Sequence, residues 1–235
     1  MRRAARGVRA PLATRLPGPQ RGCRVGGPAL GCLGGVQRTP HPNMDQGGVG
    51  RLLVASLHQG ISDLLPTRLE FYENWLRPAG LRDGSIGLAP LAAVLSFLRQ
   101  EGEPYRFVTS RAGEYAAEWT FHALSGVERG ALRALPRGLR ARMALRLARR
   151  VVRDTYKDSR TTIRLRRGEG SVDVRGSIFC SVREPVREPL CTYYASAVGR
   201  LLALCEIEGS AHTAQCRGTG ASTCRVAVIV DKSAA

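Results

Sequence analysis

The sequence feature that most limits the possible folds is the stretch 191–230, near the C-terminal end. An apolar segment that reads as a helix begins directly after Cys191. A turn at 208–210 follows it, and two short runs then flank a loop that contains two glycines. Cys216 and Cys224 stand on the two sides of this loop, with seven residues between them. A hairpin here would let these two thiols meet, and Cys191, at the head of the helix, could complete a cluster.

A second hairpin is indicated upstream of this stretch. Thr161–Arg167 and Ser171–Phe179 both alternate between apolar and polar residues, and the turn Gly168-Glu169-Gly170 joins them. Before this hairpin, the apolar spacing predicts five helices, over residues 51–66, 67–76, 86–99, 111–124 and 138–158. Helices followed by hairpins predict the α+β class: an antiparallel four-stranded sheet from two hairpins, packed against several helices.

The charge of the chain would at first suggest a nucleic-acid partner. Formal net charge is +17, but the basic residues are 34 Arg and only 2 Lys, a skew that a GC-rich coding sequence produces whatever the function. Eight of the Arg residues lie in 1–43, which contains no acidic residue. No nucleic-acid motif accompanies the excess. We therefore expect weak, salt-sensitive nucleic-acid binding and no specific nucleic-acid partner.

The composition also divides the chain into a tail and one domain. Residues 1–43 are rich in Arg, Gly and Pro without apolar periodicity, which predicts a disordered tail that the mature protein can lack, with Met44 as an alternative start. Residues 44–235 then form a single domain. Seven cysteines, an odd number, favour a reducing compartment and a cytoplasmic location. No apolar run has the roughly 18–20 residues needed to span a bilayer.

Several short motifs of the C-terminal half resemble a known family. They are the Arg-rich helix, Gly176-Ser177-Ile178-Phe179, Pro189-Leu190-Cys191, the following apolar helix, and Cys216 with Cys224. Together they resemble the vinyl-4-reductase-type domain, which also occurs in bacterial aromatic-sensing regulators and shares its fold with subunits of the eukaryotic transport-protein particle. The resemblance is clearest over 137–230. It implies an α+β fold with an apolar cavity for small hydrophobic or aromatic molecules.

The resemblance also implies a zinc site. Its thiols match Cys191, Cys216 and Cys224, but the family's Glu ligand falls on Thr213, and a threonine hydroxyl is a poor zinc ligand. His212 is the neighbouring candidate for the fourth position, although on a strand it would point to the opposite face. Thiolates and imidazole suit zinc, and four ligands close a structural site. The alternative is three small buried thiols that serve only as packing.

Candidate ligand-binding residues are the aromatic side chains of the domain, and each could equally be ordinary core. They are Trp119, Phe121, Tyr156, Phe179, Tyr193 and Tyr194. Cys180 could be a nucleophile, yet no base lies near it in the sequence, and the standard catalytic motifs do not occur. The sequence therefore favours a binding module over an enzyme. It predicts a small hydrophobic ligand and a homodimer, with a ligand-free assembly subunit as the alternative.

Overall fold

The structure, a computed structural model, describes residues 48–76 and 87–231. The predicted tail, 1–43, lies outside these residues. The elements in chain order are α1 (Arg51–Leu64), η2 (Pro66–Arg68), α2 (Leu69–Leu76), α4 (Leu88–Gln100), α5 (Glu103–His122), α6 (Gly126–Ala134), α7 (Arg137–Thr155), β1 (Arg160–Arg166), β2 (Glu169–Arg175), η3 (Ile178–Cys180), α8 (Thr192–Leu204), β3 (Gly209–Gln215), η4 (Arg217–Thr219) and β4 (Cys224–Val230). Helices precede and flank a single sheet, so the predicted α+β class is confirmed.

The sheet has four antiparallel strands in the order β1-β2-β4-β3. Each predicted hairpin is present, and β2 and β4 pair in the centre. Their inward side chains, Val172, Val174, Val226 and Val228, are almost completely buried. Alternation along β1 places Arg160, Arg164 and Arg166 on the opposite, exposed face. The sheet therefore has one core face and one face with exposed arginines.

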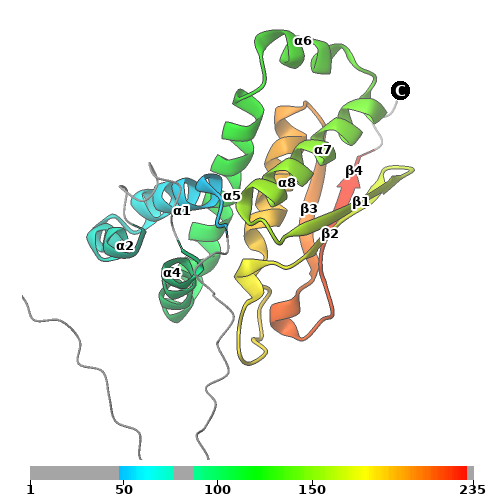
Figure 1. Ribbon diagram of the computed structural model, residues 1–235. Coiled ribbons are helices and arrows are strands. Elements are labelled where there is room, and N and C mark those ends of the chain that lie inside the picture. Colours follow the sequence, from blue (N-terminus) through cyan, green and yellow to red (C-terminus); the bar gives the residue numbers. More distant parts are fainter. Residues whose placement is uncertain (1–47, 77–86, 232–235) are drawn as a thin grey trace, which may run out of the picture. The chain divides into compact units, whose positions relative to one another are not determined.

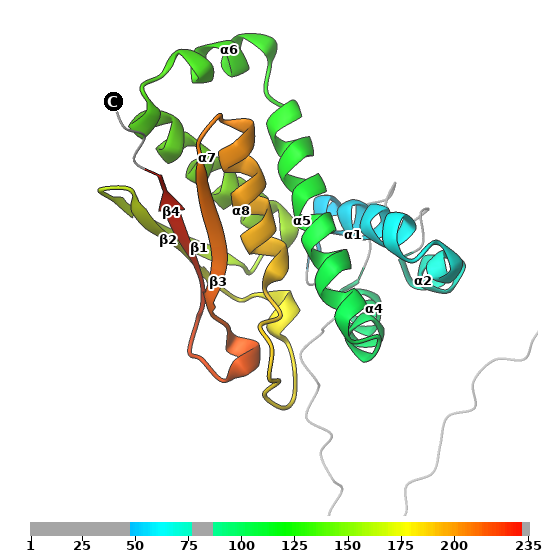
Figure 2. The ribbon, with the colours of Figure 1, turned by 180° about the vertical axis from the view of Figure 1, so that it is seen from behind.

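Two helices cover the core face, and further helices pack behind them (Figures 1 and 2). α7 packs mainly on β1 and α8 mainly on β3, while α5 packs on α8 and α1 on α5. α5 and α8 approach closely at Gly113, where an added Cβ would lie 2.2 Å from the carbonyl oxygen of Tyr193. Among the described helices, none is both long and apolar enough to cross a bilayer.

Two helical predictions need correction. α5 begins at Glu103, eight residues before the predicted start, because Pro104 stands in the first turn, where proline lacks only an amide that has no helical partner anyway. α6 was not predicted, although Ser125 and Glu128 form a capping box at its start: the Ser125 hydroxyl accepts from the amide of Glu128, whose carboxylate accepts from the amide of Ser125.

The second strand of the first hairpin is shorter than predicted. β2 ends at Arg175, because Gly176 adopts a φ of 70° and turns the chain out of the sheet. Residues Ile178–Cys180 then form the short 3-10 helix η3 instead of continuing the strand. This turn carries Cys180 away from the sheet ladder and into the interior.

Candidate metal centre

Four buried cysteines converge at one end of the sheet, and we refer to Cys180, Cys191, Cys216 and Cys224 as the thiol cluster. Their sulfur atoms all lie within 4.8 Å of one another. The Sγ of Cys180 lies 2.9 Å from that of Cys191, 3.3 Å from that of Cys216 and 3.5 Å from that of Cys224. A tetrahedral ion with Zn–S bonds of about 2.3 Å separates its sulfurs by about 3.8 Å. The cluster therefore has the ligand number and nearly the spacing of a four-thiolate metal site.

Two of the sulfurs come from the segment that joins the sheet to α8. Cys180 is the last residue of η3, and Cys191 immediately precedes the first residue of α8. The turn at Gly176 and the compact η3 bring Cys180 back under the head of α8. The Ser177 hydroxyl lies 3.7 Å from the Cys191 sulfur and adds a polar contact beside it.

The other two sulfurs flank the loop of the second hairpin, as the sequence predicts. Cys216 follows β3 and Cys224 opens β4, so the strands hold their side chains at the same end of the sheet. The amide of Ala221 donates to the carbonyl of Cys216 at 3.2 Å, which closes the loop between the two cysteines. The amide of Val186 donates to the carbonyl of Gly218 at 2.7 Å and ties this loop to the segment before α8.

The surroundings of the cluster favour thiolates at two positions. The amide of Leu190 donates to the Cys216 sulfur at 3.3 Å, and that of Arg217 donates to the Cys224 sulfur at 3.4 Å. The contacts with Cys180 and Cys191 lower the pKa of Cys216, and the contact with Cys180 is also the largest cause of the lowered pKa of Cys224. Donors that point at a sulfur stabilise its charged form, the form that binds a metal.

Helix α5 is attached to the cluster by two side chains. The Tyr105 hydroxyl donates to the carbonyl of Leu190 at 2.9 Å, and burial raises the pKa of Tyr105 well above its ordinary value. One turn further along, the hydroxyl of Thr109 lies 2.6 Å from that of Thr192, the first residue of α8. The head of α8 is thus fixed from the helical side as well as from the hairpin.

The residues considered for the fourth ligand position lie outside the thiol cluster. His212 is exposed on β3 and is not one of the groups that converge. The Thr213 hydroxyl is buried and has no hydrogen-bond partner among the described residues. Cys205, at the far end of α8, is buried away from the cluster, and burial raises its pKa to about 11. The fourth thiol is instead that of Cys180, which sequence reasoning treated only as a possible nucleophile.

The six aromatic candidates for ligand binding do not gather at one place. Phe179, Tyr193 and Tyr194 form a buried cluster in which ring centroids lie 4.8 to 5.5 Å apart. Trp119 is partly exposed and stacks on Tyr115. Phe121 is buried in α5, and Tyr156 follows α7, where it forms an isolated bridge with Val49. None of the six lines the surface hollows described next.

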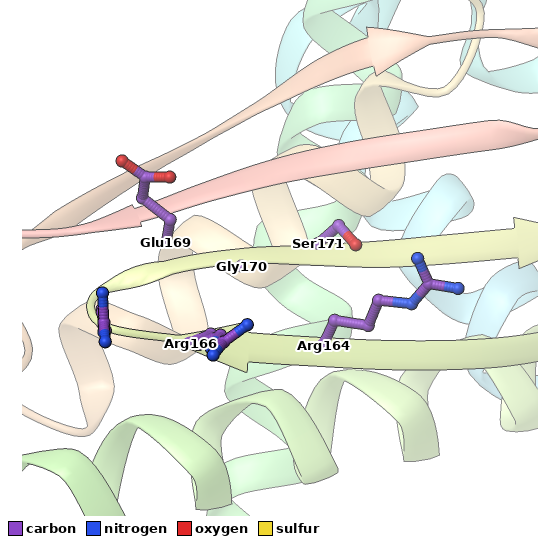
Figure 3. A pocket seen from close by; sticks show the side chains of 6 residues that line it. Arg164, Arg166, Glu169, Gly170 and Ser171 are labelled. Atoms are coloured by element: carbon purple, nitrogen blue, oxygen red, sulfur yellow. The ribbon is translucent and has the colours of Figure 1, made fainter.

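Four hollows of the described surface are large enough for a small molecule, and two of them adjoin and are described together as the first. The first lies between α7 and β1, with a volume of about 460 Å³, and a neighbouring hollow of about 480 Å³ shares Leu165 with it. The second lies on the exposed side of the first hairpin, where Arg164, Arg166 and Ser171 surround about 570 Å³ (Figure 3). The third, of about 500 Å³, lies between α5, the head of α8 and β3. Volumes of this size are typical of ligand sites.

Comparison with known proteins gives only a distant structural likeness. No family model matches the chain, and no curated protein matches it. The chain is similar to an H-NOX domain from Shewanella oneidensis in the Fe(II)CO ligation state, with 12% identity, a TM-score of 0.46, and coverage of 78% of this chain and 99% of that one. An unliganded Fe(II) H-NOX mutant from K. algicida gives 12% identity, a TM-score of 0.46, and coverage of 78% and 97%. A likeness this low carries no inference about family or ligand.

Proposed function

We propose that this protein is a binding module for a small hydrophobic molecule, and that a structural zinc ion bound by the thiol cluster organises its C-terminal half. The observation that carries the metal proposal is the convergence of four buried sulfurs, two of which accept hydrogen bonds from backbone amides. Thiolates are the ligands that select zinc among the common divalent ions. Binding would move the sulfurs of Cys180 and Cys191 apart by about 1 Å, toward tetrahedral spacing.

The site has the character of a structural centre. Catalytic zinc sites keep one position open for water or substrate, whereas four protein ligands close the coordination sphere. The most exposed member of the cluster, Cys180, is only 5% exposed. Zinc would stabilise the fold by joining η3, the head of α8 and both strands of the second hairpin.

This proposal includes the resemblance to the vinyl-4-reductase-type domain. Thr213 stands where that family has a Glu ligand, and Cys180 would supply the missing fourth ligand here. The surface hollows of ligand size support the binding role. Native mass spectrometry of the purified protein tests the proposal directly. We expect about one zinc ion per chain and a bound small molecule; protein purified without chelator that contains neither would refute it.

An aromatic surface favours a second candidate function, an assembly subunit. Phe71 and Trp75 on α2 are 46% and 40% exposed, and both contact Phe97 on α4, with ring centroids 5.3 and 5.7 Å from it. Large exposed aromatic groups are enriched in protein interfaces. If this surface forms a homodimer, the double variant Phe71→Ser/Trp75→Ser should be monomeric by light scattering. A native protein that is monomeric at high concentration would count against this function.

A further inference from the structure

The first hollow, between α7 and β1, combines a row of cations with an apolar floor, and we call it the α7–β1 groove. Arg142, Arg146 and Arg149 of α7 form one wall. The floor is formed by Leu145 of the same helix and by side chains of β1 that face the helix, Ile163 among them. Among the residues that the structure describes, no acidic side chain lines this groove.

The three arginines are not neutralised by the protein itself. Their spacing of four and three residues places them on one face of α7. In the part of the chain that the structure describes, none of them forms an ion pair, and their one side-chain hydrogen bond is from Arg146 to the sulfur of Met143 at 3.5 Å. Cations at such spacing repel one another and weaken the helix. An anion in the groove would remove this repulsion.

The groove offers two kinds of contact to a ligand, one polar and one apolar. Guanidinium groups bind carboxylate and phosphate through paired hydrogen bonds, and the hydroxyl of Thr161, which shares its strand face with Ile163, offers a further donor from β1. The floor offers apolar contact instead: Ile163 and Leu165 are only partly buried and keep surface that faces the groove, and Leu145, 1% exposed, packs beneath it. The adjoining hollow continues this floor from Leu165.

From this arrangement we propose that the α7–β1 groove binds a small soluble amphiphile that has an anionic carboxylate or phosphate head and an apolar tail. The inference rests on the proposed binding function and names its site and ligand class. The arginines hold the head, and the floor removes the tail from water. A nucleic acid fits less well, because its phosphate backbone makes no use of an apolar floor.

Isothermal titration calorimetry on the full chain, with three probes, measures separately how much the anionic head and the apolar tail contribute to affinity. Octyl phosphate, below its micelle concentration, carries both parts, inorganic phosphate only the head and octanol only the tail. We expect octyl phosphate to bind at least tenfold tighter than inorganic phosphate or octanol, since each of these two makes only one of the two kinds of contact. Equal affinity for octyl phosphate and inorganic phosphate would refute the proposal and leave a simple anion site.

Two variants and one control test the residues. Arg146→Gln should weaken octyl phosphate at least tenfold, since hydrogen bonds to charged groups are among the strongest in proteins. Ile163→Thr keeps a β-branched residue in the strand and should weaken octyl phosphate while leaving phosphate binding unchanged. Arg164→Gln removes the same charge at the residue next to Ile163, on the exposed side of the hairpin (Figure 3), and should have little effect. If Arg146→Gln and Arg164→Gln lose the same affinity for octyl phosphate, the effect comes from net charge alone and the proposed site is refuted.

Two macromolecular probes complete the test. The protein is mixed with duplex DNA and with vesicles of anionic lipid at physiological salt. If either binds and octyl phosphate fails to displace it, the proposal is refuted and this face is instead a surface for polyanions or for membranes. The zinc content of every variant is measured in parallel. If native mass spectrometry finds zinc and a bound hydrophobic molecule that Arg146→Gln and Ile163→Thr both retain, the proposed function stands and the groove is refuted.

Discussion

Replacement of Cys180 by serine tests the metal centre at its most connected sulfur. The Cys180 sulfur lies within 3.5 Å of each of the other three, so its loss removes one ligand and opens the site on the side of η3. A ligand that binds only the folded state stabilises it by about 2.7 kcal/mol at a hundredfold excess over its Kd and by about 4.1 kcal/mol at a thousandfold excess. We therefore expect Cys180→Ser to lose about 3–4 kcal/mol of stability in the presence of zinc.

That loss corresponds to a fall in Tm of roughly 6–16 °C for a domain of this size. Thermal unfolding is measured with added zinc and with chelator, and bound zinc is counted by a colorimetric release assay. Cys205→Ser is the matched control, because Cys205 is equally buried but lies outside the cluster. Its Tm should respond to chelator as the wild type does. Wild-type protein without zinc, or Cys180→Ser protein that keeps one zinc per chain and the full response to chelator, would refute the four-thiolate site.

Three further predictions concern packing, anchoring and pH. Gly113→Ala should destabilise the fold by about 1–3 kcal/mol in chemical denaturation because its Cβ meets the backbone of α8, whereas Gly130→Ala, in open space on α6, should stabilise it by about 0.5–1 kcal/mol; equal effects would contradict the close approach. Tyr105→Phe should cost about 1–3 kcal/mol, since it leaves the buried carbonyl of Leu190 without its donor; an unchanged denaturation midpoint would argue against this anchor. The lowered pKa of Cys216 means that the stability it contributes is fully present above about pH 8.5, the ordinary thiol pKa, and is lost as the pH falls. Zinc retention measured from pH 8.5 to 5 should therefore decrease with acidity, and retention independent of pH would count against thiolate ligands.

The two hairpins and three of the four thiols could be predicted because their signals are local. Alternation marks the strands, and Cys216 and Cys224 flank a short glycine-containing loop whose closure brings them together. Cys180 was missed for a physical reason. The apolar residues Val172, Val174 and Ile178 keep the period of a strand across Gly176, so the pattern hides the turn at that glycine. Only the positive φ at Gly176 shows where the strand stops.

The helical half shows a similar limit of sequence patterns. Proline both ends helices and opens them, so apolar spacing alone predicts a start at residue 111 although Pro104 stands in the first turn of α5. The capping box of α6 could have been found from Ser125 and Glu128, whose spacing of three residues is its signature. The α7–β1 groove could not be predicted, since it depends on which face of the arginine-rich helix lies beside an edge strand.

The position of the thiol cluster along the chain also bears on the order of folding. Its outermost ligands, Cys180 and Cys224, are 44 residues apart, and the first three ligands follow one another at intervals of 11 and 25 residues. The entropy of closing such loops grows only slowly with their length. Contacts between α5 and α8 join segments much farther apart in the chain, and Thr109 and Thr192, for example, are 83 residues apart. The cross-link that zinc would provide therefore joins segments nearer in the chain than the α5–α8 contact does, and in refolding it would close before these two helices come together.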